Sequence, residues 1–180
     1  NDIETLQSKY LTSLSNLEVN ESNITDKFLG NFQFIGFILH AFPKAKIIHT
    51  KRDAIATCWS IYKYYFDNKG NGWAYDFQDL VDYYRLYVKL MDFWHKLFPN
   101  QIYDLVYEDL TNNQEEETKK LLKYCELDWD ENCLDFQNTK RAVKTASVLQ
   151  VRQKMYQGSS EAWKKHEKFL KPLIEGLEGL

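Results

Sequence analysis

The sequence predicts an α/β domain in which a short parallel sheet is flanked by helices. The run from Ala45 to Lys51 is too brief for a helix and is rich in β-branched residues, as a buried strand would be. Apolar residues then recur at helical spacing from Ala54 to Phe66, and a second strand-like run, QIYDLVY at 101–107, follows a long helical stretch. Strands that alternate with helices pair in parallel through right-handed crossovers.

The size and composition of the chain favour a single domain. With 180 residues, 44% of them hydrophobic, the chain can bury a core, so we expect one domain over 1–180, with 1–22 a leading helix and connector and 23–180 the body. The net charge of −3 and the pI of about 5.8 give no overall attraction to nucleic acid or to an anionic membrane. Any anion-binding site must therefore be local.

The cysteines and the hydropathy of the chain limit the kinds of protein that it can be. Cys58, Cys125 and Cys133 are odd in number and lack CxxC spacing, which predicts free, buried thiols rather than disulfides or metal ligands. No run approaches the roughly 18 to 20 apolar residues of a membrane span, and the first residues, Asn1 to Glu4, are not a signal peptide. We expect a cytoplasmic location.

The elements before Phe66 follow from local patterns. A helix is predicted over 2–16, and a short strand over Asn23 to Lys27. An apolar helix capped by Asn31 ends at Pro43, and Asp53 caps the helix that begins at Ala54.

Local patterns also predict the elements after Phe66. Two glycines mark a loop over 67–73, and an apolar stripe at helical spacing predicts a long helix over 76–98. The remaining expectations are a strand over 101–107, helices over 113–125 and 130–136, a polar crossing over 137–157 and a terminal helix over 159–177.

Arg52 is the first candidate site residue. It stands where a strand ends and a helix begins, and open α/β sheets bind anions at such positions. Ser60 lies about two turns along that helix and could add a hydroxyl donor. The alternative is that Arg52 and Asp53 form an ordinary surface pair at a helix start.

The run FPKAKIIHTKRDAIATCWS at 42–60 resembles the 3′-phosphate-binding segment of the sulfotransferases, in which a Ser follows eight positions after the Arg. The likeness runs from about 26 to 165 and is strongest to the bacterial tetratricopeptide-linked sulfotransferases, relatives of tyrosylprotein sulfotransferase. It implies the P-loop-like three-layer fold, with an incomplete sheet, and the donor 3′-phosphoadenosine 5′-phosphosulfate. Arg52 and Ser60 would then hold the 3′-phosphate, and no metal would be needed.

Two further segments resemble the family. Thr25-Asp26-Lys27 is similar to its Asp-Lys-x-Pro-x-Asn-Phe motif, which implies a catalytic role for Lys27 at the transferring sulfuryl group, although Leu29-Gly30 stands where Pro-Leu is usual. The segment from Val106 to Leu110 resembles the family's Tyr-Glu-Asp-Leu, which puts Tyr107 near the adenine. The alternatives are a solvated surface lysine and a core tyrosine.

The basic stretch at 140–152 resembles the family's Arg-Thr-Ala-Ser-x-x-Gln-Val-Arg, with Lys144 in place of the first Arg. By this resemblance Ser147 assists catalysis, and Thr145 and Arg152 contact the nucleotide. By the resemblance Gln157 replaces an Arg found in many relatives, so one cation of the 3′-phosphate clamp is either missing or supplied by Lys154. A solvated loop would show the same charges.

The family's Pro-Arg-Ser-Gly-Thr-Thr loop, which holds the 5′-phosphosulfate, does not occur in these 180 residues. We therefore expect a carboxyl-terminal portion that is inactive alone and needs an upstream segment with that loop and, in the tetratricopeptide-linked branch, the repeats. The catalytic base of the tyrosylprotein branch also lies upstream. None of His40, His49, His95 and His166 is predicted to replace it, because each falls in a predicted helix or strand.

The expected activity is sulfuryl transfer to an acceptor hydroxyl on protein tyrosine, carbohydrate or a small molecule. One alternative is a non-catalytic nucleotide-binding or scaffold domain of the same fold. Another is a P-loop kinase, against which the lack of a GxxxxGK[ST] loop in this sequence argues.

Overall fold

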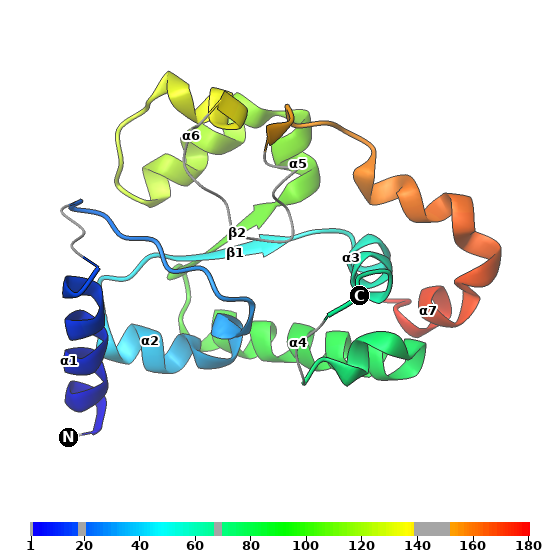
Figure 1. Ribbon diagram of the computed structural model, residues 1–180, viewed down its shortest axis with the longest axis horizontal. Coiled ribbons are helices and arrows are strands. Elements are labelled where there is room, and N and C mark those ends of the chain that lie inside the picture. The colour runs from blue at the N-terminus through cyan, green and yellow to red at the C-terminus, as the bar shows by residue number, and fades with distance from the viewer. Residues whose placement is uncertain (1, 18–20, 67–69, 139–151) are drawn as a thin grey trace. The chain divides into compact units, whose positions relative to one another are not determined.

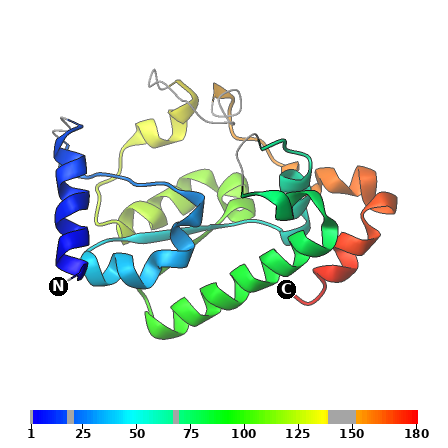
Figure 2. The same ribbon diagram turned by 60° about the horizontal axis from the view of Figure 1, so that its bottom comes forward.

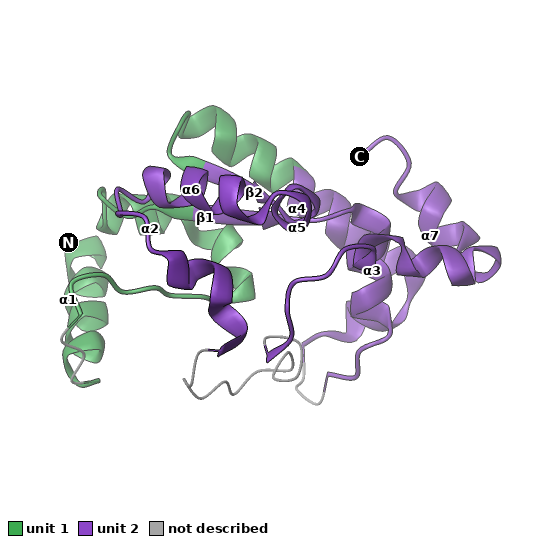
Figure 3. Ribbon diagram, turned by 90° about the horizontal axis from the view of Figure 1, so that it is seen from above, with its two compact units in different colours: residues 1–47, 89–102 green, residues 48–88, 103–180 purple. Residues whose placement is uncertain are grey.

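The computed structural model describes residues 2–17, 21–66, 70–138 and 152–180. They fall into two units, which Figure 3 colours separately: unit 1 comprises 1–47 and 89–102, and unit 2 comprises 48–88 and 103–180. The long helix α4 (Phe77–Leu97) contributes residues to both. Each unit has its own internal contacts.

Unit 1 contains α1 (Asp2–Ser15), the 3₁₀ helix η1 (Leu29–Phe34), α2 (Ile35–Ala41) and the end of α4. Gln7 Nε2 on α1 donates to the Ala41 carbonyl at 2.8 Å. A Cβ on Gly36 would lie 2.9 Å from the Trp94 ring, and the Trp94 indole N–H donates to the Phe32 carbonyl at 2.8 Å. Glycine at 36 therefore lets α2 approach α4 closely.

The predicted strand over Asn23 to Lys27 is wrong. These residues have no strand pairing in the described structure, and a strand is not stable without a neighbouring ladder. The predicted cap is also wrong, because Asn31 lies inside η1 and its amide donates to Asp26 Oδ1 at 3.2 Å instead. The helix that Asn31 was expected to begin is present, as η1 followed by α2.

Within the described residues the sheet consists of β1 (Ile47–Lys51) and β2 (Ile102–Val106). Figure 1 shows the two strands side by side and parallel. Two residues, Arg52 and Asp53, separate β1 from helix α3 (Ala54–Tyr62), and α5 (Tyr107–Asn112) follows β2 directly. The predicted α/β class, with helices that flank a short parallel sheet, is confirmed. The short helix α5 was not predicted.

Helix α4 confirms the predicted long amphipathic helix, and Figure 2 shows it along its length. Asp76 caps its start, because Asp76 Oδ1 accepts the amides of Gln78 and Asp79 at 2.8 and 3.1 Å. Its first half packs into the core of unit 2. That core consists of Cys58, Leu80, Val81, Leu173 and Leu177, all buried.

The predicted terminal helix over 159–177 is broken in two. A 3₁₀ helix η5 (Ser159–Phe169) is followed by α7 (Lys171–Gly176), and the buried Leu170 stands between them. Pro172 explains the break, because it has no N–H to continue the first helix and is well suited to the first turn of the second. Helix α3 is also shorter than predicted and ends at Tyr62.

The remaining described elements are η2 (Gly72–Tyr75), α6 (Gln114–Tyr124) and η3 (Glu131–Asn138). All three cysteines are free thiols, as predicted, but only Cys58 is fully buried; Cys125 and Cys133 are half-buried. No described helix is long and apolar enough to cross a membrane.

Candidate functional site

The carboxyl ends of β1 and β2 bring Arg52 and Tyr107 together in unit 2. Arg52 is the first residue after β1, and Tyr107 is the first after β2. The Arg52 guanidinium carbon lies 5.2 Å from the centroid of the Tyr107 ring, within cation–π range. Parallel strands end at the same sheet edge, so two residues distant in the sequence meet there.

The start of η5 completes this edge. Arg52 Nε donates to Ser160 Oγ at 3.1 Å, and Arg52 Nη2 donates to the Ser159 carbonyl at 2.7 Å. Ser159 Oγ in turn donates to the Tyr107 hydroxyl at 2.9 Å. Gly158, with φ of +86°, makes the turn into η5. The two serines therefore attach the C-terminal segment to both strand ends.

Glu108 joins the same network. Glu108 Oε1 accepts the Asp53 amide at 3.1 Å and the Ser160 hydroxyl. Burial raises the pKa of Glu108, but the bonds from Ser160 and Asp53 and the Arg52 charge outweigh it, so the pKa lies below the ordinary value. Glu108 is therefore ionised at neutral pH and anchors the edge as an acceptor.

Asp53 caps α3 as predicted. Its Oδ1 accepts the Ala56 amide at 2.7 Å, while Arg52 bonds to Ser159 and Ser160. The alternative of a simple Arg52–Asp53 surface pair does not describe this geometry, because each side chain has a different partner. Ser60 lies on α3 with its side chain exposed.

Lys27 belongs to unit 1 and is exposed. The residue before it is held from two directions, because Asp26 Oδ2 accepts the Tyr10 hydroxyl at 3.0 Å and Asp26 Oδ1 accepts the Asn31 amide. Burial, followed by this bond and the Asp26 charge, raises the pKa of Tyr10. The backbone next to Lys27 is thus attached to α1 and η1.

The basic stretch is described only in part. Thr145 and Ser147 lie outside the described residues, whereas Arg152 and Lys154 are exposed. Gln157 donates from Nε2 to the Thr111 carbonyl at 3.4 Å. Gln157 therefore makes a weak contact with the end of α5.

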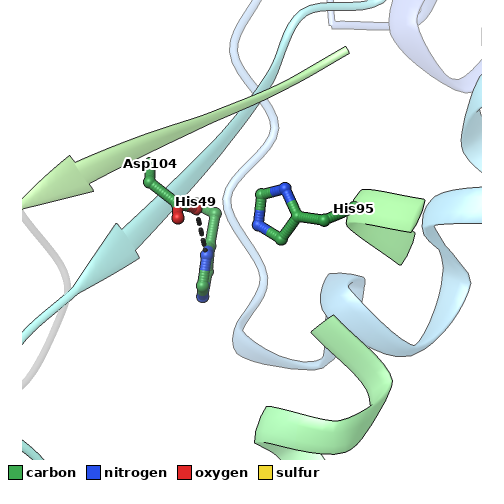
Figure 4. Close-up of side chains that lie close together, drawn as sticks. All are labelled: His49, His95 and Asp104. Carbon is green, nitrogen blue, oxygen red and sulfur yellow. Dashed lines mark hydrogen bonds and ion pairs between the residues drawn. The ribbon is translucent and has the colours of Figure 1, made fainter. Parts of the chain in front are cut away.

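A second polar group in unit 2 involves His49 on β1. Its Nδ1 lies 2.7 Å from Asp104 Oδ1 on β2, an interaction drawn as a dashed line in Figure 4. Its Nε2 is hydrogen-bonded to the Tyr87 hydroxyl. Burial and the Asp104 charge raise the pKa of Tyr87 to about 12. Both ring nitrogens have protein partners, so this imidazole is a structural link between the sheet and α4. His95, also drawn in Figure 4, belongs to unit 1.

Sequence reasoning missed Ser159, Ser160 and Glu108. Glu108 was visible within the Tyr-Glu-Asp-Leu segment, but its neighbours across the fold were not. Ser159 and Ser160 follow a glycine at a helix start, where hydroxyls commonly bond to polar groups, and this Gly-Ser-Ser pattern is the signal that could have found them.

Comparison with known proteins identifies the family. The model of the sulfotransferase family matches residues 3–131, which is most of the chain. The chain therefore belongs to the sulfotransferase family. The matched range includes Lys27, Arg52, Ser60 and Tyr107, and ends before the basic stretch and Ser159.

The chain is also similar to an uncharacterized protein of Aquifex aeolicus (strain VF5), with 42% identity over 171 residues. That alignment covers 94% of this chain but 22% of the relative. The chain thus spans about a fifth of the length of the relative.

Proposed function

We propose that this chain contributes the 3′-phosphate and adenine end of a sulfotransferase site that uses 3′-phosphoadenosine 5′-phosphosulfate. The observation that carries the proposal is the contact between Arg52 and Tyr107 at the carboxyl edge of the sheet. A guanidinium suits a phosphate, and an aromatic ring beside it suits a purine.

The residues of unit 2 fit such a nucleotide chemically. Arg52 keeps donors beyond those bonded to Ser159 and Ser160, and a phosphate monoester accepts bidentate bonds from a guanidinium. Ser60, exposed on α3, adds a hydroxyl donor. Resemblance to the family adds Thr145, Arg152 and Lys154 to the nucleotide contacts.

The reaction is an in-line transfer. The acceptor oxygen forms a bond to sulfur while the bond from sulfur to the bridging oxygen breaks, and the electron pair of that bond goes to the 5′-phosphate of the leaving nucleotide. The acceptor proton passes to a base outside these 180 residues. Lys27, assisted by Ser147, stabilises the charge that develops on the bridging oxygen, which lowers the transition state more than the ground state.

The acceptor proposed is a protein tyrosine, because the tetratricopeptide-linked sulfotransferases that the motifs resemble are relatives of tyrosylprotein sulfotransferase. Carbohydrate and small-molecule hydroxyls are the competing acceptors. A further segment of the polypeptide supplies the 5′-phosphosulfate loop. The greater length of the Aquifex aeolicus relative is compatible with such a segment.

An assay of the full-length polypeptide that the gene encodes tests the proposal. Labelled sulfate should pass from the donor to tyrosyl peptides, and binding of 3′-phosphoadenosine 5′-phosphate should be tighter than binding of adenosine 5′-phosphate. Binding without transfer to any tyrosyl, carbohydrate or phenolic acceptor would favour the non-catalytic nucleotide-binding domain. Transfer of phosphate from ATP would favour a kinase.

A further inference from the structure

One edge of the Arg52 guanidinium is held by two consecutive serines. A guanidinium presents a side edge, formed by Nε and Nη2, and a terminal edge, formed by Nη1 and the second N–H of Nη2. The bonds to Ser160 Oγ and to the Ser159 carbonyl both use the side edge. Among the described residues none accepts from Nη1, so the terminal edge is the pair of donors left for a bidentate ligand.

Glu108 fixes the direction of the bond between Arg52 and Ser160. Ser160 has one hydroxyl proton and donates it to Glu108 Oε1, so its oxygen receives the proton of Arg52 Nε. The negative charge of Glu108 polarises the hydroxyl and strengthens the bond from Arg52. The Asp53 amide, which also donates to Glu108 Oε1, holds the carboxylate in place.

Tyr107 restrains the face of the Arg52 guanidinium. Its ring lies under the guanidinium, and its hydroxyl accepts from Ser159 Oγ, so the same segment holds both the edge and the face of Arg52. A long side chain ordered before the ligand arrives loses less entropy on binding. The network therefore favours one orientation of Arg52 in the free protein.

We propose that Ser160 is a positioning residue that, together with Ser159 and Glu108, presets the terminal edge of Arg52 for a phosphate monoester. The inference rests on the proposed function, since the monoester is the 3′-phosphate of the donor nucleotide. It assigns a role to the start of η5, which lies outside the range matched by the family model.

Calorimetry on the full-length polypeptide tests this role with two nucleotides. Ser160→Ala should weaken binding of 3′-phosphoadenosine 5′-phosphate about five- to tenfold, because Arg52 loses the hydrogen bond that orients its side chain. The same change should alter binding of adenosine 5′-phosphate less than about twofold. Ser160→Thr keeps the hydroxyl and should stay within about twofold of wild type. Ser13→Ala is the matched control, because it removes a serine hydroxyl bonded to the Lys9 carbonyl on the exposed helix α1.

Two further variants separate positioning from general stability. Glu108→Gln keeps an acceptor without the charge and should weaken binding of the 3′-phosphorylated nucleotide about threefold. In an Arg52→Ala background, Ser160→Ala should have no further effect, since Ser160 acts through Arg52. Equal losses for both nucleotides, or an undiminished Ser160 effect without Arg52, would overturn the inference.

The same measurements distinguish this inference from the proposed function. If wild type prefers the 3′-phosphate and Arg52→Ala abolishes the preference, but Ser160→Ala does not alter it, the inference alone fails. If wild type shows no preference for the 3′-phosphate, the proposed function fails and the inference fails with it.

Discussion

The guanidinium of Arg52 lies over the ring of Tyr107, 5.2 Å from its centroid, although the two residues follow different strands. The contact joins the two strand ends, and among the described residues no acceptor bonds to the Nη1 group of Arg52. A cation near an aromatic ring is attracted by about 0.5 to 2 kcal/mol, depending on solvent exposure. The pair thus places a guanidinium, which suits a phosphate, beside an aromatic ring, which suits a purine.

Arg52→Ala should weaken binding of 3′-phosphoadenosine 5′-phosphate by about 2 to 4 kcal/mol, because a charge-assisted bidentate contact is lost. Binding of adenosine 5′-phosphate, which lacks the 3′ group, should hardly change. Calorimetry with the two nucleotides measures the difference. A loss of the same size for both would remove Arg52 from the 3′-phosphate.

Lys27→Ala should lower the turnover rate of the full-length polypeptide about 10²- to 10³-fold and leave donor affinity nearly unchanged, because Lys27 acts mainly in the transition state. Steady-state kinetics at saturating donor provide the measurement. Lys9→Ala, a change of another lysine in unit 1, is the control. The assignment would be wrong if the Lys27 variant kept more than about half of the wild-type rate.

The elements that sequence reasoning predicted correctly are those set by local patterns. The cap at Asp53 and the helix α4 depend on neighbours within one or two turns, and the meeting of Arg52 and Tyr107 follows from parallel strands alone. The strand expected at Asn23 was wrong because pairing depends on a distant partner, and β-propensity does not reveal whether one exists.

The missed site residues form hydrogen bonds with residues far away in the sequence. Arg52 and Ser160 are 108 positions apart, and Asp53 and Glu108 are 55 apart. No periodicity connects residues at such separations, so the hydrogen bonds between them could not be read from spacing. The break at Leu170 was different in kind, since Pro172 was visible in the sequence and marks a helix start.

Glu108 should make stability depend on acid pH. Its pKa is below the ordinary 4.5 in the folded chain, so its contribution is fully present above about pH 4.5 and is lost as the pH falls through the folded pKa. Glu108→Gln should therefore lower stability at pH 7 and flatten this acid loss, as measured by urea unfolding at several pH values. Glu131→Gln, the same change at an exposed position on η3, is the control. A Glu108→Gln profile parallel to wild type would contradict the expectation.

Cys58 should resist alkylation in the folded protein. Burial, followed by the Asp53 charge, raises the pKa of its thiol to about 12, and the side chain is fully buried, so little reactive thiolate is accessible. Mass spectrometry after brief treatment with iodoacetamide should find label at the half-buried Cys125 and Cys133 before Cys58. In denaturant all three should react alike. If Cys58 reacted as fast in the folded protein as in denaturant, this part of the core would be accessible to the reagent.

The 180 residues alone should bind nucleotide weakly and transfer no sulfuryl group. In the proposed function Arg52, Ser60 and Tyr107 bind the 3′ end of the donor, whereas these 180 residues contain no Pro-Arg-Ser-Gly-Thr-Thr loop for the 5′-phosphosulfate. Both strands of the described two-stranded sheet are edge strands, and Phe28 and Leu29 are 66% and 80% exposed, so the isolated chain should also self-associate.

The test compares this polypeptide with one extended by an upstream segment that carries the phosphosulfate loop, by sedimentation and by transfer of labelled sulfate to tyrosyl and phenolic acceptors. The extended polypeptide should be both more soluble and active. Phe28→Ser in the short polypeptide should reduce association without creating activity, since it removes apolar surface and supplies no phosphosulfate site. Sustained turnover by a soluble monomer of the 180 residues would show that the essential groups lie within them. The hypothesis that Lys27 and Arg52 belong to a larger site would then be wrong.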